Sequence, residues 1–257
     1  MMKIGIVGIG FVGNALLKTF NEKHIECLPY DKYKEIGSLL DTLKADIIFL
    51  CLPTLLGDKG YNLESFNEIL TFYNNNLYKG DIIIKSTCLP TTCSNFQKEY
   101  VNLKIYHNPE FLSSATAYED FNNQKHIVIG GYSEKLINLY KKYFPNSEIS
   151  IMTTNESESL KIFANSFYAV KIQYFNELYD MCKKIDNCNY KTIVKGIIKN
   201  GWVSENHTSV PGSDGKLSFG GACFPKDTRA LLSFLNDNNI RCEVLKGAVK
   251  ENKEMRD

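Results

Sequence analysis

The chain has 257 residues, of which 44% are hydrophobic, and a formal net charge of +1 at pH 7. This length allows one large or two modest domains, and the balanced charge argues against a nucleic-acid partner. No apolar run approaches the ~20 residues that span a bilayer, so no membrane partner is expected. The eight cysteines form no CxxC pair and no zinc-like spacing, which favours reduced thiols in a cytoplasmic protein without a metal site.

The chain opens on a predicted strand, Lys3 to Val7, rather than on a signal peptide. The strand leads into GIGFVG at positions 8–13 and then into a helical apolar pattern. Strand, GxGxxG and helix in this order are typical of a dinucleotide-binding turn, whose glycines let the pyrophosphate approach the helix N-terminus. The next predicted strand, Ile25 to Tyr30, ends in Asp31, a carboxylate that would bind the ribose hydroxyls and repel a 2′-phosphate. The pattern predicts NAD rather than NADP, and a glycine turn without a ligand is the alternative. The expected contacts are Gly8, Gly10, Phe11, Val12, Gly13 and Asp31.

Further apolar runs alternate with helical patterns along the first half of the chain. They cover residues 45–52, 81–84, 104–107, 126–131 and 148–152. Continuous rather than alternating apolar strands indicate a parallel sheet that is covered on both faces. The predicted fold class is therefore α/β, with a Rossmann-like doubly wound parallel sheet over residues 1–153. Pro53-Thr54 and Ser86-Thr87 each follow a strand at the edge where such sheets bind ligands, so both loops are expected to face the cofactor.

A long helical pattern opens the second half. Asn155, with Glu158 three residues later, looks like a capping box, and the pattern runs to about Ile185. Its apolar residues occupy more than one face, so it must be buried by the nucleotide domain, by later helices or by a second subunit. Lys161 and Asn165 share a polar face at i, i+4, either by accident or for function. With a helix over 189–199 and two closing helices, residues 154–257 are expected to form an all-helical domain around a long central helix.

A cysteine lies in the segment SFGGACFPKD at positions 218–227. Cys223 follows a pair of glycines closely and precedes Asp227 by four residues. Glycines let backbone amides approach a ligand, and a thiol near Lys226 and Asp227 could become a thiolate nucleophile. A cysteine that only packs is the alternative.

Five segments in this order resemble the UDP-glucose/GDP-mannose dehydrogenase family, over essentially the whole chain. They are GIVGIGFVG at 5–13, Ser-Thr at 86–87, NPEFL at 108–112, residues 158–177, and FGGACFPKD at 219–227. The resemblance implies two successive NAD-dependent oxidations that turn UDP-glucose into UDP-glucuronate. It also implies a homodimer through the helix near 155–187.

The resemblance assigns roles to residues of this chain. Cys223 captures the sugar aldehyde as a thiohemiacetal, which becomes a thioester that water hydrolyses. Lys161 and Asn165 stabilise oxyanions, Thr87 and Asp227 position water and proton carriers, and Glu110 is the acid or base. The remaining implied cofactor contacts are Pro53, Thr54, Ser86, Thr87 and Lys226. The implied substrate contacts are Glu110, Phe111, Leu112, Ser113, Lys161, Asn165, Phe219, Gly220, Gly221 and Cys223.

The sequence departs from the family's pattern at four places. Ser114 and Lys85 stand where glutamates are usual, and residues 210–216 lack the usual substrate-binding arginine. Family members also continue beyond the position of Asp257 into a further domain that helps to grip UDP. The alternatives are therefore the same chemistry on a UDP-N-acetylhexosamine or GDP-mannose, a single-hydride hydroxyacid dehydrogenase, and an inactive NAD-binding regulatory remnant.

Overall fold

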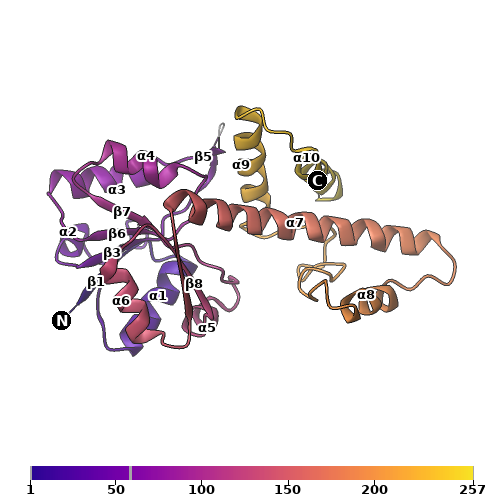
Figure 1. Ribbon diagram of the computed structural model, residues 1–257, viewed down its shortest axis with the longest axis horizontal. Coiled ribbons are helices and arrows are strands. Elements are labelled where there is room, and N and C mark those ends of the chain that lie inside the picture. The colour runs from indigo at the N-terminus through magenta and orange to yellow at the C-terminus, as the bar shows by residue number, and fades with distance from the viewer. Residues whose placement is uncertain (1, 58–59, 257) are drawn as a thin grey trace. The chain divides into compact units, whose positions relative to one another are not determined.

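Within residues 2–57 and 60–256, which a computed structural model describes, seven strands form one sheet in the order β2-β1-β3-β6-β7-β8-β9 (Figure 1). Met1 and Asp257, the outer ends of the two predicted domains, lie outside the described residues. The strands of this sheet are β1 (Lys3–Val7), β2 (Glu26–Tyr30), β3 (Ile47–Leu50), β6 (Asp81–Ile84), β7 (Lys104–His107), β8 (His126–Gly130) and β9 (Glu148–Met152). Two short strands, β4 (Leu56–Gly57) and β5 (Gly60–Tyr61), lie outside it.

Strand β3 shows why the apolar runs are continuous. Ile47 and Phe49 pack into one core, and Ile48 and Leu50 pack into a second core on the other face of the sheet. All four side chains are fully buried. Successive side chains of a strand point to opposite faces, so a strand with both faces covered needs apolar residues at every position. The prediction of an α/β sheet covered on both sides is confirmed.

Helices cover the two faces of this sheet, with α1, α5 and α6 on one face and α3 and α4 on the other (Figure 1). The helices of this part are α1 (Phe11–Glu22), α2 (Leu39–Thr42), α3 (Glu64–Asn75), α4 (Thr92–Glu99), α5 (Ala117–Asn122) and α6 (Glu134–Tyr143). The chain runs from β1 out to β2 and then returns to β3 on the other side of β1. The carboxyl ends of β1 and β3 therefore form the topological switch point where sheets of this kind bind ligands.

The sheet is mostly parallel, and one pair of strands departs from the predicted parallel arrangement. β7 and β8 pair antiparallel, while the other pairs are parallel. The connection from β7 to β8 contains α5, a helix of six residues. After this connection the chain enters β8 from the edge at which β7 ended.

The long helix α7 (Thr154–Lys184) starts with a different cap from the one predicted. The Thr153 hydroxyl accepts a hydrogen bond from the Glu156 amide, and the Glu156 carboxylate accepts one from the Thr153 amide. This reciprocal pair is the capping box. Glu158, which the sequence placed in the cap, is instead buried and accepts a 2.7 Å hydrogen bond from the Cys93 amide. Asn155 therefore lies inside the helix, because the threonine two residues earlier takes the capping position.

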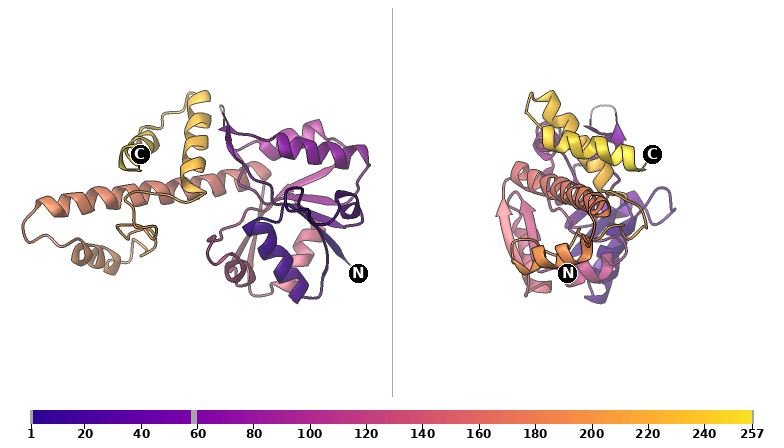
Figure 2. Two further views of the ribbon diagram at one scale, coloured as in Figure 1. Left: turned by 180° about the vertical axis from the view of Figure 1, so that it is seen from behind. Right: turned by 90° about the vertical axis from the view of Figure 1, so that its right-hand side faces the viewer.

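The chain divides into two compact units within α7, between Lys161 and Ile162, with the short segment Leu56–Gly60 counted in the second unit. The predicted domain boundary at residues 153 and 154 stays a prediction. The other helices of the second unit are α8 (Tyr190–Lys199), α9 (Phe224–Asp237) and α10 (Glu243–Arg256). Within this unit α8 and α10 pack on opposite sides of α7 (Figure 2), through contacts such as Tyr179 with Tyr190 and Gln173 with Glu251. None of the described helices is both long enough and apolar enough to cross a bilayer.

Candidate functional site

The glycine turn between β1 and α1 has the geometry that a dinucleotide needs. Gly8 has φ +89°, and a Cβ there would lie 2.6 Å from the carbonyl oxygen of Cys51. A Cβ at Gly13 would lie 1.9 Å from the carbonyl oxygen of Gly8, so both positions exclude a side chain. At Gly10, the N-cap of α1, a Cβ would meet nothing within 4 Å. The helix N-terminus is therefore open at the point where a pyrophosphate would bind. Phe11 and Val12, the other predicted contacts in this turn, form the start of α1.

Asp31, the predicted ribose ligand, also holds this turn together. One carboxylate oxygen accepts a 2.8 Å hydrogen bond from the Ile9 amide, and the other accepts bonds from the amides of Tyr33 and Lys34. Burial alone would raise the pKa of Asp31, but these amides and the Lys34 ammonium hold it below the ordinary value. The Lys34 side chain in turn donates to the Ile9 carbonyl. Asp31 is therefore an ionised acceptor that is oriented before any ribose binds.

The two loops predicted to face the cofactor lie at the same edge of the sheet. β3 and β6 pair in parallel, with Leu50 opposite Ile84, so Pro53-Thr54 and Ser86-Thr87 both follow carboxyl ends. The Ser86 hydroxyl links the loops by donating a 2.6 Å hydrogen bond to the Leu52 carbonyl. Thr54 and Thr87 are buried. The sheet therefore brings both loops to the switch point beside the glycine turn.

The turn after β7 carries Glu110 and is held by a buried network. Asn108 donates its amide to the Val128 carbonyl and accepts hydrogen bonds from the Tyr140 hydroxyl and the Lys85 ammonium. Lys85 also donates to the Pro109 carbonyl, at 3.4 Å. Burial lowers the pKa of Lys85 to about 8. The sequence marked Lys85 only as a departure from the family pattern; the structure makes it the support of the turn that carries Glu110.

Lys161 and Glu110 form a buried ion pair, with 3.3 Å between Nζ and Oε1. The Lys161 ammonium also lies 4.9 Å from the centre of the Phe111 ring, a favourable cation–π distance. The other oxygen of Glu110 accepts a hydrogen bond from the Leu112 amide. The structure thus brings together Lys161, Glu110, Phe111 and Leu112, to which the resemblance assigned catalysis and substrate binding. Ser113 instead donates its amide to Asp120, which fixes the following bend.

His107, which the sequence analysis did not select, helps to place this cluster. Its Nδ1 lies 2.8 Å from the hydroxyl of Ser157, in the first turn of α7. Burial lowers the pKa of His107 to about 3, so the ring is neutral near pH 7. His107 therefore links the end of β7 to the start of α7 as a buried, neutral side chain. The only sequence signal was its place directly before Asn108-Pro109-Glu110.

In the second unit, Asp227 is the centre of the predicted catalytic group. Its side chain is fully buried in the first turn of α9. One carboxylate oxygen accepts a 2.7 Å hydrogen bond from the Asn165 amide, and the other lies 2.5 Å from the Lys226 ammonium. A buried carboxylate is stable only when it is paired and hydrogen-bonded, and Asp227 has both kinds of partner. Asn165, Lys226 and Asp227 are thus brought together as one polar group.

Cys223 is the N-cap residue of α9 and is partly buried. A thiolate at a helix N-terminus lies at the positive end of the helix dipole, which favours the ionised form. Of the predicted substrate contacts before it, Phe219 is buried, whereas Gly221 is exposed with φ +78°. Any contribution of Phe219 to a ligand would have to come from its backbone.

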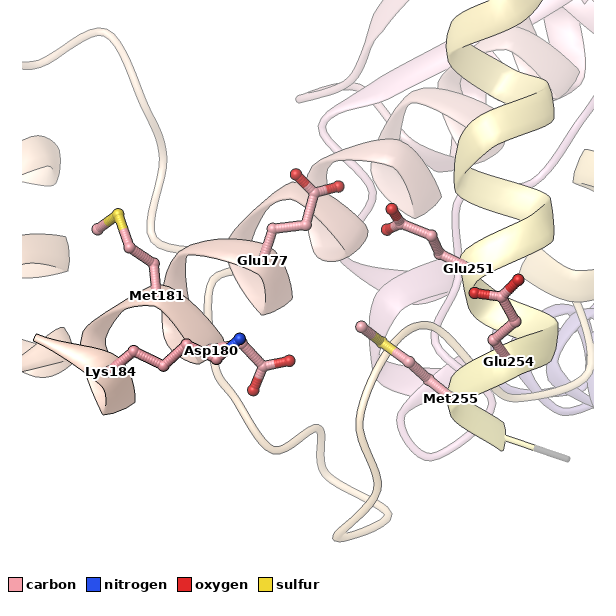
Figure 3. Close-up of a pocket in the computed structure, with 7 residues that line it drawn as sticks. All are labelled: Glu177, Asp180, Met181, Lys184, Glu251, Glu254 and Met255. Carbon is pink, nitrogen blue, oxygen red and sulfur yellow. The ribbon is translucent and has the colours of Figure 1, made fainter.

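A separate pocket of about 500 Å³ lies between α7 and α10 in the second unit (Figure 3). It is lined by Glu177, Asp180, Met181, Lys184, Glu251, Glu254 and Met255. None of these residues belongs to the predicted site. Among the described residues, no group of three or more His, Cys, Asp or Glu side chains is placed to hold a metal ion.

Comparison with known proteins gives consistent matches along the chain. The NAD binding domain of the UDP-glucose/GDP-mannose dehydrogenase family matches residues 38–147, and the central domain of that family matches residues 155–254. A UDP-glucose 6-dehydrogenase of Rickettsia conorii is 34% identical over 82% of this chain and 49% of its own length. A UDP-glucose 6-dehydrogenase of Campylobacter jejuni is 30% identical over 98% of this chain and 72% of its own length.

A solved UDP-glucose dehydrogenase from Pyrobaculum islandicum shares the fold, with a TM-score of 0.89 at 20% identity. That match covers 99% of this chain and 68% of the solved one. The chain thus spans about half the length of the Rickettsia relative and about two thirds of the solved structure.

Proposed function

The chain belongs to the UDP-glucose/GDP-mannose dehydrogenase family, and on that basis we propose that it oxidises UDP-glucose to UDP-glucuronate with NAD. The observation that carries the proposal is the group at the start of α9. There Cys223 caps the helix, and one turn later the buried Asp227 is fixed by Asn165 and Lys226. A thiol that only packs would need no buried carboxylate one helical turn away that is itself paired with an amide and an ammonium.

The first unit supplies the cofactor site in this proposal. Gly10 leaves the N-terminus of α1 open for the pyrophosphate, and Asp31 presents an ionised carboxylate for a ribose. When bound, NAD accepts one hydride from the sugar C6 in each of two oxidations. The chain's own residues must therefore hold the aldehyde between the two oxidations and release the acid at the end.

Cys223 holds the aldehyde. Its sulfur adds to the C6 carbonyl, and the resulting oxyanion takes a proton to give a thiohemiacetal. Loss of a second hydride from C6 leaves a thioester, and water attacks that carbonyl to release the carboxylate and free the sulfur. The whole reaction consumes one UDP-glucose, two NAD⁺ and one water, and yields one UDP-glucuronate, two NADH and three protons.

The polar residues stabilise the charges that these reaction steps create. We assign Lys161 and Asn165 to the oxyanions, because a single well-placed donor of this kind is worth ~10²–10³ in rate. Glu110, ion-paired with Lys161, serves as acid or base, and Asp227 and Thr87 position water and proton carriers. Among the predicted contacts, Phe111 and Gly221 are exposed and therefore accessible to a sugar nucleotide.

The test is the stoichiometry of NADH against sugar. We expect two NADH per UDP-glucose and formation of UDP-glucuronate. Two NADH with a UDP-N-acetylhexosamine or GDP-mannose, and none with UDP-glucose, would move the activity to that substrate. One NADH per substrate would indicate a single-hydride dehydrogenase. NAD binding without turnover of any nucleotide sugar would favour an inactive regulatory subunit.

We further propose that the protein is a homodimer through α7. Five apolar side chains near this helix are exposed although each is large: Phe163, Phe167, Tyr174, Met181 and Ile185. Their spacings of four and seven residues place them on one side of the helix. Contiguous exposed apolar patches beyond a few hundred Å² generally mark interfaces. A second copy of the same face would cover this stripe. We also propose a cytoplasmic location, because the eight cysteines have neither a CxxC pair nor a zinc-like spacing, a pattern typical of reduced thiols.

A further inference from the structure

Ser218, at the start of the cysteine segment, has an unusual backbone for a serine. Its φ is +59°, in the left-handed region that glycine favours. For a residue with a Cβ this conformation is unfavourable, and it persists only when the surroundings hold it. Ser218 is also buried. Other groups must therefore fix it.

Every polar atom of Ser218 has a partner in the second unit. Its amide donates to Oδ1 of Asn176 at 2.9 Å, and its hydroxyl donates to Oε1 of Gln173 at 2.5 Å. The same hydroxyl accepts a 2.8 Å hydrogen bond from Asn252, and its carbonyl accepts one from Arg256. Asn176 and Gln173 belong to α7, and Asn252 and Arg256 belong to α10. Two helices that are far apart in sequence thus hold one serine.

The hydrogen-bond network around Ser218 also includes the next residue toward Cys223. The side-chain amide of Asn252 also donates a 2.6 Å hydrogen bond to the Phe219 carbonyl. At Gly220 a Cβ would lie 2.2 Å from Nη1 of Arg256, so the guanidinium packs directly against the glycine backbone. Glycine itself imposes few limits on the chain. The path of the segment from Gly220 to Cys223 therefore depends on its two ends, which are the Ser218 network and α9.

The orientation of Gln173 is fixed from the pocket between α7 and α10. Its amide nitrogen donates a 2.7 Å hydrogen bond to Oε2 of Glu251, so the amide oxygen is the atom that faces Ser218. In Figure 3 the side chains of Glu251, on α10, and Glu177, on α7, extend toward each other. Burial and the charge of Glu251 raise the pKa of Glu177. A chain of oriented groups thus runs from Glu251 through Gln173 to Ser218.

We propose that Gln173, Asn252 and Arg256 are positioning residues that fix Ser218 and the Phe219 carbonyl, and thereby fix the Cys223 thiol at the N-terminus of α9. The role of the thiol as nucleophile rests on the proposed function, whereas the anchoring of the segment rests on the contacts given above. In this proposal α10 acts on the reaction through Ser218 and the Phe219 carbonyl.

The test uses the whole chain with Asn252→Asp, which keeps the shape but removes both donated hydrogen bonds. We expect kcat with UDP-glucose and NAD to fall roughly 10- to 100-fold, as a displacement of about 1 Å at a reacting group does, with the KM for NAD within about twofold. The pH midpoint for alkylation of Cys223 by iodoacetamide, followed by peptide mass spectrometry, should move toward the ~8.5 of an ordinary thiol. Ser218→Gly keeps the left-handed backbone and removes the hydroxyl, so it should show a smaller shift in the same direction.

Asn238→Asp is the matched control, because Asn238 is exposed at the end of α9 and donates only to the Phe234 carbonyl. It should leave the alkylation profile unchanged. Unchanged Cys223 alkylation in folded Asn252→Asp and Ser218→Gly proteins would overturn the proposal; if Asn252→Asp does not fold, Ser218→Gly decides alone. Because alkylation needs no substrate, this result is independent of turnover. A failure of the proposed function would appear separately, as absent NADH production by the unmutated protein.

Discussion

The side-chain amide of Asn165 donates a 2.7 Å hydrogen bond to Oδ2 of Asp227, and both residues are buried. The bond joins α7 to the first turn of α9, where Lys226 is paired with the other carboxylate oxygen. The amide proposed to stabilise oxyanions thus also orients the carboxylate proposed to position water. Asn165 and Asp227 are in direct contact, so their substitutions should not have additive effects on the rate.

Asn165→Ala should destabilise the protein by about 1–3 kcal/mol, because it leaves a buried carboxylate oxygen without its donor. The free energy of unfolding in urea measures this. Asn238→Ala removes an exposed amide and should change stability by less than about 0.5 kcal/mol. Equal stability of the two variants would mean that Asp227 finds another donor.

Cys223→Ser should stop the reaction before the acid while leaving NAD affinity unchanged, because the predicted glycine and aspartate contacts lie in the other unit. A serine hydroxyl is a far weaker nucleophile than a partly ionised thiol, and an oxygen ester hydrolyses less readily than a thioester. Turnover should fall by several decades, and intact-mass analysis should detect any trapped sugar adduct. Two NADH per sugar at a near-normal rate from this variant would refute the covalent mechanism.

Asp31→Asn should relax the preference for NAD over NADP. The amide keeps the shape of the side chain but no longer repels a 2′-phosphate, and Lys34 then supplies an uncompensated positive charge beside the turn. We expect the ratio of kcat/KM for NADP to that for NAD to rise at least about tenfold, or ~1.4 kcal/mol. Equal turnover of both cofactors by the unmutated protein would contradict the role of this carboxylate.

Lys85 should make stability depend on pH in the alkaline range. Burial lowers its pKa in the folded protein to about 8, from an ordinary value of 10.5, and the charge of Lys161 acts in the same direction. Between these values the unfolded chain binds more protons, so folding becomes more favourable as the pH rises. Compared with Lys85→Met, the unmutated protein should gain about 2–3 kcal/mol between pH 7.5 and pH 10.5.

Urea unfolding at several pH values measures this difference. Lys98→Met, which removes an exposed lysine, should show no such trend. A pH-independent difference between the Lys85→Met and unmutated proteins would mean that Lys85 stays fully protonated in the fold.

Phe167→Glu should convert the proposed dimer into a monomer. The side chain is 62% exposed and belongs to the apolar stripe along α7, so a second copy would have to bury the introduced charge. Light scattering at micromolar concentration should report the mass of one chain. Val101→Glu, at an even more exposed apolar residue of the first unit, should leave the mass unchanged. A monomeric mass for the unmutated protein would reject the dimer.

Periodicity and local chemistry were sufficient for the elements of the fold. A strand such as β3 must be apolar at every position because both of its faces are covered, and that pattern is visible without a structure. The same holds for the glycine turn, since its steric demands act on neighbours in the chain. Cys223 in its glycine-rich segment could likewise be selected from a local motif, whereas the role of Glu110 came only from the resemblance to the family.

Only the tertiary structure decided which residues that lie far apart in the sequence interact with one another. Thr153 rather than Asn155 caps α7, and Glu158 accepts a hydrogen bond from the Cys93 amide, 65 residues away. The reversal of β8 is likewise visible only in its antiparallel pairing with β7. Ser218 reads as an ordinary loop residue, yet Gln173 and Asn252 hold it in a glycine-like conformation. A hydrogen bond of this kind depends on how two helices that are distant in the sequence pack together, and no local pattern of residues encodes that packing.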